Sequence, residues 1–272
     1  MIFNINSNEY VTGSIVDYSG LIKMPNARFK VEGTTSFVYS RFEPYGKYVF
    51  QFSPFDWFEG SLFYTDINSL GYPDFERSSG GGQSQKDKGF TLKTRLIKEG
   101  ECYGFGFSFC DYLPNIAVGL VDFAGTSLSS SEYVVASKSV GRFDFTAGMG
   151  WGALGSSDNL GGNPFSAISE EFNNRGSGYS SGLMGGVPGV SSWFKGPTSI
   201  FGGLEYVIPV NRYSPVKSKL KIEYDSIDHK LSDFCRECEG NRFKELESPM
   251  SCLLYTSPSP RDVEESRMPS SA

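Results

Sequence analysis

The sequence predicts an all-β protein whose strands form an antiparallel meander, and three observations support this prediction. Side chains alternate between apolar and polar over much of the chain, as they do along a half-buried strand. The 272 residues include 23 Phe, 15 Tyr and 3 Trp, which are residue types favoured in strands. Connections rich in Gly, Pro, Asn and Ser separate the alternating runs, with no helical pattern between consecutive strands.

The alternating runs define nine expected strands. In the seventh of them, Phe143, Phe145 and Trp151 occupy one face while Arg142 and Asp144 occupy the other. The same pattern, with a period of two residues, identifies the remaining eight. In chain order the expected strands are Thr35–Phe42, Lys47–Phe52, Phe58–Asp66, Gly89–Ile97, Ile116–Phe123, Glu132–Lys138, Arg142–Trp151, Ile200–Ile208 and Lys219–Asp225.

One segment departs from the strand pattern. Residues 152–203 contain 13 Gly in 52 positions, together with the helix-breaking pair Asn163-Pro164. Such a composition predicts a long loop, and long loops inside a compact domain are usually functional or disordered. Within it we expect one short helix over Ser166–Phe172.

The pattern alone fits two architectures. A soluble sandwich would bury the apolar set between two sheets. An outer-membrane-type barrel would show that set to lipid and keep the charges in its lumen. Aromatic residues near strand ends, namely Trp151, Tyr206 and Tyr224, suit the aromatic girdle of a barrel. The charged faces suit a wet lumen and an ordinary solvent face equally well, so both architectures stay open at this point.

Composition and motifs argue against several kinds of chemistry. The net charge of −6 makes nucleic acid an unexpected partner. Gly178–Gly182 matches the pattern G-x-S-x-G, with Asp225 and the single His, His229, following it. A nucleophile elbow needs a strand before it and a helix after it, whereas this stretch lies in a Gly/Ser loop. We therefore predict a non-enzymatic protein with no catalytic residues, no metal and no cofactor.

Four of the five cysteines, all except Cys252 near the end of the chain, leave three alternatives open. Cys235 and Cys238 form a C-x-x-C pair, and Cys102 and Cys110 lie far upstream. Local disulfides would suit an oxidising compartment. Free thiols are the second alternative, and metal or redox chemistry is the third, although the spacing does not match two zinc knuckles.

The two ends of the chain carry further expectations. Cys252–Asp262 and Ser266–Ala272 resemble the translation of a sequencing adapter, so we expect residues 252–272 to be disordered and foreign to the fold. Residues 1–251 are then expected to form one truncated domain, which the family resemblance given next implies to be a partial barrel. Residues 1–6 show no basic start, apolar core or lipobox, so we expect the export signal to be absent from this chain.

Several motifs in order resemble the YjbH/GfcD (YbjH) family. They begin with Gly20–Arg28, which reads GLIKMPNAR, and the most specific run is Pro114–Thr126, which reads PNIAVGLVDFAGT. The remaining motifs are Trp57–Glu59, Tyr64–Asp66, Asp87–Lys93, Ser131–Lys138, Gly148–Gly152, Asn163-Pro164, Phe201–Tyr206 and Glu223–Asp225.

The resemblance implies a non-enzymatic outer-membrane β-barrel protein, often lipid-anchored, that serves exopolysaccharide or capsule production or export. Family members are longer, so these residues correspond to an N-terminal portion. The implied partners are outer-membrane lipid, exopolysaccharide and other proteins of the secretion machinery. Two rival functions remain: a soluble periplasmic carbohydrate-binding β domain, and a glycan-processing enzyme. The enzyme would draw an acidic pair from Glu59, Asp66, Asp122 and Glu132.

If the resemblance holds, the two faces of the strands acquire roles. The residues expected to face the lumen and a glycan are Lys93, Arg95, Arg142, Asp144, Lys219, Lys221 and Glu223. Their alternative interpretation is a set of ordinary solvent-facing charges. The residues expected to face lipid are Phe90, Leu92, Phe143, Phe145, Leu220 and Ile222.

Overall fold

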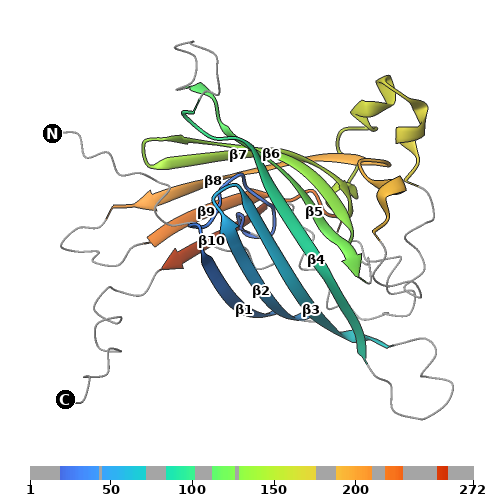
Figure 1. The fold of residues 1–272 in the computed structure, drawn as a ribbon, viewed down its shortest axis with the longest axis horizontal. Coiled ribbons are helices and arrows are strands. Elements are labelled where there is room, and N and C mark those ends of the chain that lie inside the picture. The colour runs from blue at the N-terminus through green and yellow to red at the C-terminus, as the bar shows by residue number, and fades with distance from the viewer. Residues whose placement is uncertain are drawn as a thin grey trace.

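The computed structural model describes residues 19–42, 45–71, 84–101, 112–125, 129–175, 188–209, 218–228 and 250–256. Ten strands form one sheet in which each strand pairs with the next along the chain (Figure 1). They are β1 (Thr34–Phe42), β2 (Tyr45–Phe55), β3 (Phe58–Gly71), β4 (Ser84–Ile97), β5 (Asn115–Gly125), β6 (Ser131–Val140), β7 (Phe143–Gly152), β8 (Thr198–Ile208), β9 (Ser218–Tyr224) and β10 (Met250–Thr256). All nine strands predicted from the alternation are present.

The all-β, antiparallel meander is thus confirmed, and the sheet is open. In the described part of the chain no pairing joins β1 to β10, so the sheet does not close into a barrel. No helix among the described residues is long and apolar enough to cross a membrane.

Strand β10 differs from the expectation of disorder after residue 251. It pairs with β9 from Met250, opposite Tyr224, to Thr256, opposite Ser218. An edge strand presents unpaired backbone N–H and C=O groups to any extended segment that reaches it. The segment Met250–Thr256 is extended and pairs with the edge that β9 presents, so the first residues after 251 form a strand. The expected foreign origin of residues 252–272 stays a prediction.

The two faces of the sheet differ in polarity. Because successive side chains point to opposite faces, each strand contributes to both. The convex face exposes large apolar side chains, which include Phe37, Tyr39, Tyr48, Phe50, Leu62, Tyr64, Phe90, Phe143, Phe145, Ile200, Ile222 and Tyr224. The concave face buries polar and charged ones, which include Lys47, Gln51, Glu59, Thr65, Asp87, Thr91, Lys93, Ser137, Asp144, Thr146, Glu205, Lys219, Lys221 and Glu223.

The concave face is covered by residues 19–30, which we call the inner segment. Seven strand-to-strand steps separate β2 from β9, about 34 Å on a flat sheet. Lys30 contacts Gln51 on β2, and Ile22, eight positions earlier, contacts Glu223 on β9. Eight extended residues reach at most about 28 Å, to which the side chains of Lys30, Gln51 and Glu223 add their own lengths. The sheet curves around the inner segment, as Figure 1 shows.

A compact apolar core joins the inner segment to the middle of the sheet. Its buried members are Leu21, Met24, Ala27, Phe29, Ala117, Val121, Tyr133, Val135, Leu154 and Phe201. Close packing depends on glycine at one point, since a Cβ on Gly119 would lie 2.2 Å from Cζ of Tyr133 on the neighbouring strand. Asp122, with a φ of 49°, lies where the β4–β5 register shifts between Phe90 and Leu92, and its side chain is buried.

The expected helix over Ser166–Phe172 is wrong in detail. Two short 3₁₀ turns replace it, η4 (Pro164–Ala167) and η5 (Glu170–Asn173). Ser169 adopts an extended conformation between them and accepts a hydrogen bond from the Glu171 N–H, so the helix cannot continue through it. Two further 3₁₀ turns, η3 (Ala153–Gly155) and η6 (Val190–Ser192), flank this pair along the chain.

The described part of this loop covers the end of the convex face at β7. Trp151 stacks on Phe165 at 5.4 Å and meets Phe194 edge-on at 5.1 Å, and it is fully buried. Arg175 makes a bidentate ion pair with Glu132, with both N···O distances at 2.7 Å. Trp151 therefore belongs to a small core of its own. Its expected place in an exposed aromatic girdle is wrong, whereas Tyr224 is exposed on the convex face.

Candidate functional site

Among the described residues, a dense set of buried polar contacts joins the inner segment to the concave face. At one end, residues 20–25 form a tight turn closed by a bridge between Gly20 and Pro25. Three consecutive N–H groups of this turn, from Ile22, Lys23 and Met24, donate to the carboxylate of Glu223 at 2.8–3.1 Å. Successive backbone N–H groups arranged in this way form an anion-binding nest. Here the anion is a side chain of the protein itself.

Lys221 contacts the same turn from the neighbouring concave position on β9. Its Nζ donates to the carbonyl oxygens of Gly20 and Leu21, both at 2.8 Å. It also forms an ion pair with Glu205 on β8 at 3.2 Å. The N–H groups of the turn thus bind the carboxylate of Glu223, and its C=O groups bind the ammonium group of Lys221. Both residues lie on β9.

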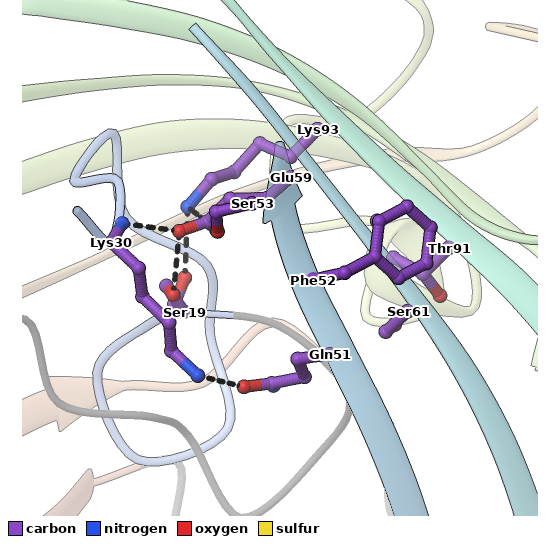
Figure 2. Close-up of a pocket in the computed structure, with 10 residues that line it drawn as sticks. Ser19, Lys30, Gln51, Phe52, Ser53, Glu59, Ser61, Thr91 and Lys93 are labelled. Carbon is purple, nitrogen blue, oxygen red and sulfur yellow. Dashed lines mark hydrogen bonds and ion pairs between the residues drawn. The ribbon is translucent and has the colours of Figure 1, made fainter. Parts of the chain in front are cut away.

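A second cluster lies where the inner segment crosses β3 and β4. Lys93 Nζ forms an ion pair with Glu59 at 2.9 Å and donates to the carbonyl oxygen of Arg28. The other oxygen of Glu59 accepts from the Ser19 hydroxyl at 3.0 Å and from the Lys30 N–H (Figure 2). Lys93 is 1% exposed, so the neutralising partners are needed to offset its desolvation.

A small polar cavity adjoins this cluster. It has room for about one water molecule, about 10 Å³, and Figure 2 shows residues of the sheet and of the inner segment around it. Three buried polar atoms that line it, Gln51 Nε2, Ser53 Oγ and Ser61 Oγ, have no hydrogen-bond partner among the described residues. Lys30 reaches Gln51 Oε1 across it, and burial lowers the pKa of Lys30 although Glu59 opposes that shift.

Arg28 anchors the other end of the inner segment. Its guanidinium binds Asp144 through Nε at 2.8 Å and Nη2 at 2.6 Å, and it binds Glu99 at 2.6 Å and the Ser139 hydroxyl at 2.6 Å. Burial alone would lower the pKa of Arg28, but the two carboxylates outweigh it and raise the pKa. Burial would raise the pKa of Glu99, yet the bonds from Arg28 and Lys138 lower it. Both shifts favour the charged forms of Arg28 and Glu99.

Most of the residues predicted to face a glycan hold the inner segment instead. Lys93, Asp144, Lys221 and Glu223 lie on the concave face, buried, and each contacts the inner segment directly.

The other three predicted residues have different surroundings. Lys219 is buried on the concave face. Arg95 is half-buried, with its guanidinium 4.5 Å from the ring centre of Phe29. Arg142 lies exposed in the turn between β6 and β7. In this structure, then, the buried residues of the predicted set face the protein's own chain, and Arg142 faces solvent. That any of them contacts a glycan stays a prediction.

Sequence reasoning missed the inner segment as a part of the site. The motif GLIKMPNAR at residues 20–28 was recognised as a family motif, but it has neither strand nor helix periodicity and received no structural role. One available signal was its density of apolar residues, Leu21, Ile22, Met24 and Ala27, ahead of the first strand. A run of this kind that is neither strand nor helix must be buried against another element.

The acids considered for a catalytic pair lie in separate environments. Glu59 pairs with Lys93 on the concave face, whereas Glu132 pairs with Arg175 under the long loop on the convex face. Asp66 pairs with Lys86 at 2.5 Å, and Asp122 accepts from the Ser129 N–H at 3.2 Å.

Other candidate motifs lie outside the described residues. They are Cys102, Cys110, Cys235, Cys238, Gly178–Gly182 and His229. Within the described part of the chain no group of three or more His, Cys, Asp or Glu is placed to hold a metal ion.

The fold and the site together define a class of protein. It is an open antiparallel meander with an apolar convex face and a concave face filled by the chain's own N-terminal inner segment. The chain belongs to the YjbH family, described as exopolysaccharide biosynthesis protein YbjH, whose model matches residues 14–249.

A curated relative agrees with this assignment. The chain is 39% identical over 220 residues to a protein of Escherichia coli strain K12 described as uncharacterized lipoprotein YjbH. The match covers 81% of this chain and 28% of that relative, so the chain spans less than a third of the relative's length. No solved structure matches the chain.

Proposed function

We propose that this chain forms part of an outer-membrane β-barrel that serves the production or export of exopolysaccharide. The observation that carries the proposal is the convex face. Soluble monomers seldom expose apolar patches larger than a few hundred Å². Here exposed aromatic and aliphatic side chains run across the sheet from Phe37 on β1 to Tyr224 on β9, while most of the buried charges of the strands lie on the opposite face. The charges of the convex face include Asp66 and Lys86, which pair with each other, and Glu132, which pairs with Arg175 under the long loop. This distribution is typical of strands that face lipid on one side.

The family assignment supports the glycan part of the proposal, because the family model is described by exopolysaccharide biosynthesis. The description of the relative as a lipoprotein supports attachment to a membrane. In the proposed arrangement the inner segment fills the lumen beside β2–β9. The concave charges would then hold a plug in place, and a glycan would not contact them directly.

The membrane part is tested at Phe145, which is 49% exposed on the convex face and lies opposite Leu204, near the middle of β8. Placing Arg there should cost about 2–4 kcal/mol if the site faces the hydrocarbon core. The full-length protein carrying Phe145→Arg should therefore reach the outer-membrane fraction in lower yield and lose heat-resistant mobility on gels. Phe145→Leu is the matched control and should insert as the unsubstituted protein does.

The glycan part needs a separate measurement. Deleting the gene should reduce the polysaccharide recovered from the cell surface and medium, and the full-length gene should restore it. Recovery of the full-length protein in the soluble periplasmic fraction would overturn the barrel and favour a carbohydrate-binding domain. Loss of polymer turnover on replacing Glu59 or Asp122 by the corresponding amide, with folding intact, would favour an enzyme.

A further inference from the structure

The small polar cavity beside the Lys93–Glu59 pair is lined by hydrogen-bonding groups that the contacts described above do not use. They are Gln51 Nε2, Ser53 Oγ and Ser61 Oγ, and none of the three atoms has a hydrogen-bond partner among the described residues (Figure 2). The three residues are only 5%, 1% and 3% exposed, respectively. Because buried polar groups without a hydrogen bond are destabilising, all three atoms require a partner within the cavity.

The strand register places the three side chains around one point. Ser61 on β3 lies directly opposite Gln51 on β2, and Ser53 lies two positions further along the same face of β2. Ser53 and Ser61 are therefore diagonal neighbours, whose Cβ atoms are about 7–8 Å apart. A hydroxyl group cannot cross that distance directly, whereas two hydrogen bonds through one shared atom span about 5.6 Å. The register also shifts between Phe52 and Phe55, so the ladder is irregular beside Ser53.

The orientation of the Gln51 amide is fixed from the other side. Lys30 Nζ and the Ser36 hydroxyl both donate to Gln51 Oε1, the second of them at 3.2 Å. An ammonium group can only donate, so the amide oxygen must be the atom that faces Lys30. The amide nitrogen then lies on the other branch of the group, as a donor that needs an acceptor.

The size and the chemistry of the cavity together select its occupant. Its volume of about 10 Å³ is close to the least that admits one water molecule, which excludes an organic ligand. A metal cation does not fit, because an amide nitrogen presents hydrogen atoms and has no lone pair to give. A halide ion is larger than water, and the carboxylate of Glu59 also lines the cavity.

We propose that this cavity is the binding site of one ordered water molecule. The water accepts a hydrogen bond from Gln51 Nε2 and donates one each to Ser53 Oγ and Ser61 Oγ. Three hydrogen bonds are the usual number for a buried water. By holding the Gln51 amide in the orientation that receives Lys30, the water links the last residue of the inner segment to β2 and β3. The site does not depend on a membrane and so goes beyond the proposed function.

The direct test is a crystal structure of the full-length protein at a resolution that shows ordered water, grown with bromide in place of chloride. A density peak within hydrogen-bond distance of all three atoms, without anomalous signal from bromide, is expected. An anomalous peak would show an anion and overturn the water. A cavity without density, or direct hydrogen bonds among the three side chains, would overturn the site.

A stability measurement gives a change of opposite sign for the two alternatives. If the water is bound, Ser61→Ala removes one of its partners and should raise the equilibrium constant for unfolding about fivefold. If the cavity is dry, the same substitution removes an unpaired buried hydroxyl, and the constant should fall or stay unchanged. Ser166→Ala, in η4 and outside the cavity, is the control and should leave the constant unchanged.

The double substitution tests whether the two serines share one molecule. Ser53→Ala and Ser61→Ala each weaken the same water, so their combined effect on unfolding should be smaller than the product of the separate effects. Independent effects that multiply would overturn the shared site. The outcome is separate from that of the proposed function, because the cavity stays intact whether the full-length protein fractionates with the outer membrane or without detergent.

Discussion

The convex and concave faces belong to the same strands but are organised by opposite principles. On the convex face the apolar side chains are exposed, and neighbouring aromatic rings, such as Tyr39 and Tyr48 at 4.8 Å, make their closest contacts with one another. On the concave face charged side chains are buried, and each described cluster takes hydrogen bonds or an ion pair from the inner segment. The convex face therefore leaves apolar surface uncovered, whereas the concave face is covered by the inner segment.

This contrast teaches that alternation along a strand says which residues share a face but not what covers that face. The charged set was expected to meet a lumen or solvent. It meets a peptide, whose N–H and C=O groups supply the hydrogen bonds that water would otherwise give. Substitutions on the two faces should consequently differ in the size and origin of their effects.

The largest effect is expected at Arg28. Arg28→Ala removes the shared partner of Asp144 and Glu99 and leaves Asp144 buried without it. Breaking a buried ion pair from one side costs about 3–5 kcal/mol. The free energy of unfolding, followed by Trp fluorescence in denaturant, should fall by that amount.

Glu32→Ala is the control for Arg28, since Glu32 is an exposed charge just after the inner segment. Its effect should stay within about 0.5 kcal/mol. Similar losses for the two variants would contradict the assignment of the concave charges to the inner segment.

A smaller effect is expected at Gly119, where the packing of the concave face leaves no room for a side chain. In Gly119→Ala the new Cβ would lie 2.2 Å from the Tyr133 ring, so the ring must move within a packed core. Overpacking of this kind costs about 1–3 kcal/mol. Gly46→Ala, on β2, is the matched control because a Cβ there would meet nothing within 4 Å. The same denaturation measurement should separate the two variants, and an equal response would show that the Tyr133 contact is loose.

The smallest effect is expected from pH. The folded pKa of Glu99 lies below its ordinary value of 4.5 because Arg28 and Lys138 favour its charged form. Its contribution to stability is therefore complete above about pH 4.5 and is lost as the pH falls through the lower folded value. In Glu99→Gln the stability should be lower near neutral pH and should change less between pH 5 and pH 3. A variant that follows the same acid profile as the unsubstituted protein would show that Glu99 takes no part in it.

Much of the sheet was predictable, because its order in space is its order in the chain. Each strand pairs with its neighbour in sequence, so alternation and turn residues were enough to identify β1–β9. The clusters at the inner segment could not be found in this way. Glu223 lies 200 positions from Lys23, and no periodicity connects a carboxylate on the ninth strand with the N–H groups of an irregular turn. The composition likewise did not show that Ser169 would cap η5 and so divide the expected helix into two turns.

The position of the inner segment also constrains how the protein reaches its native state. The backbone groups of its tight turn bind Lys221 and Glu223, on the ninth strand in chain order. Contacts over such a separation form slowly, because the entropy of closing a long loop is lost before the contacts contribute any stabilising free energy. The earliest described residues of the chain therefore cannot reach their final place until β9 is available. We therefore expect residues 20–25 and β9 to become ordered together, late in folding.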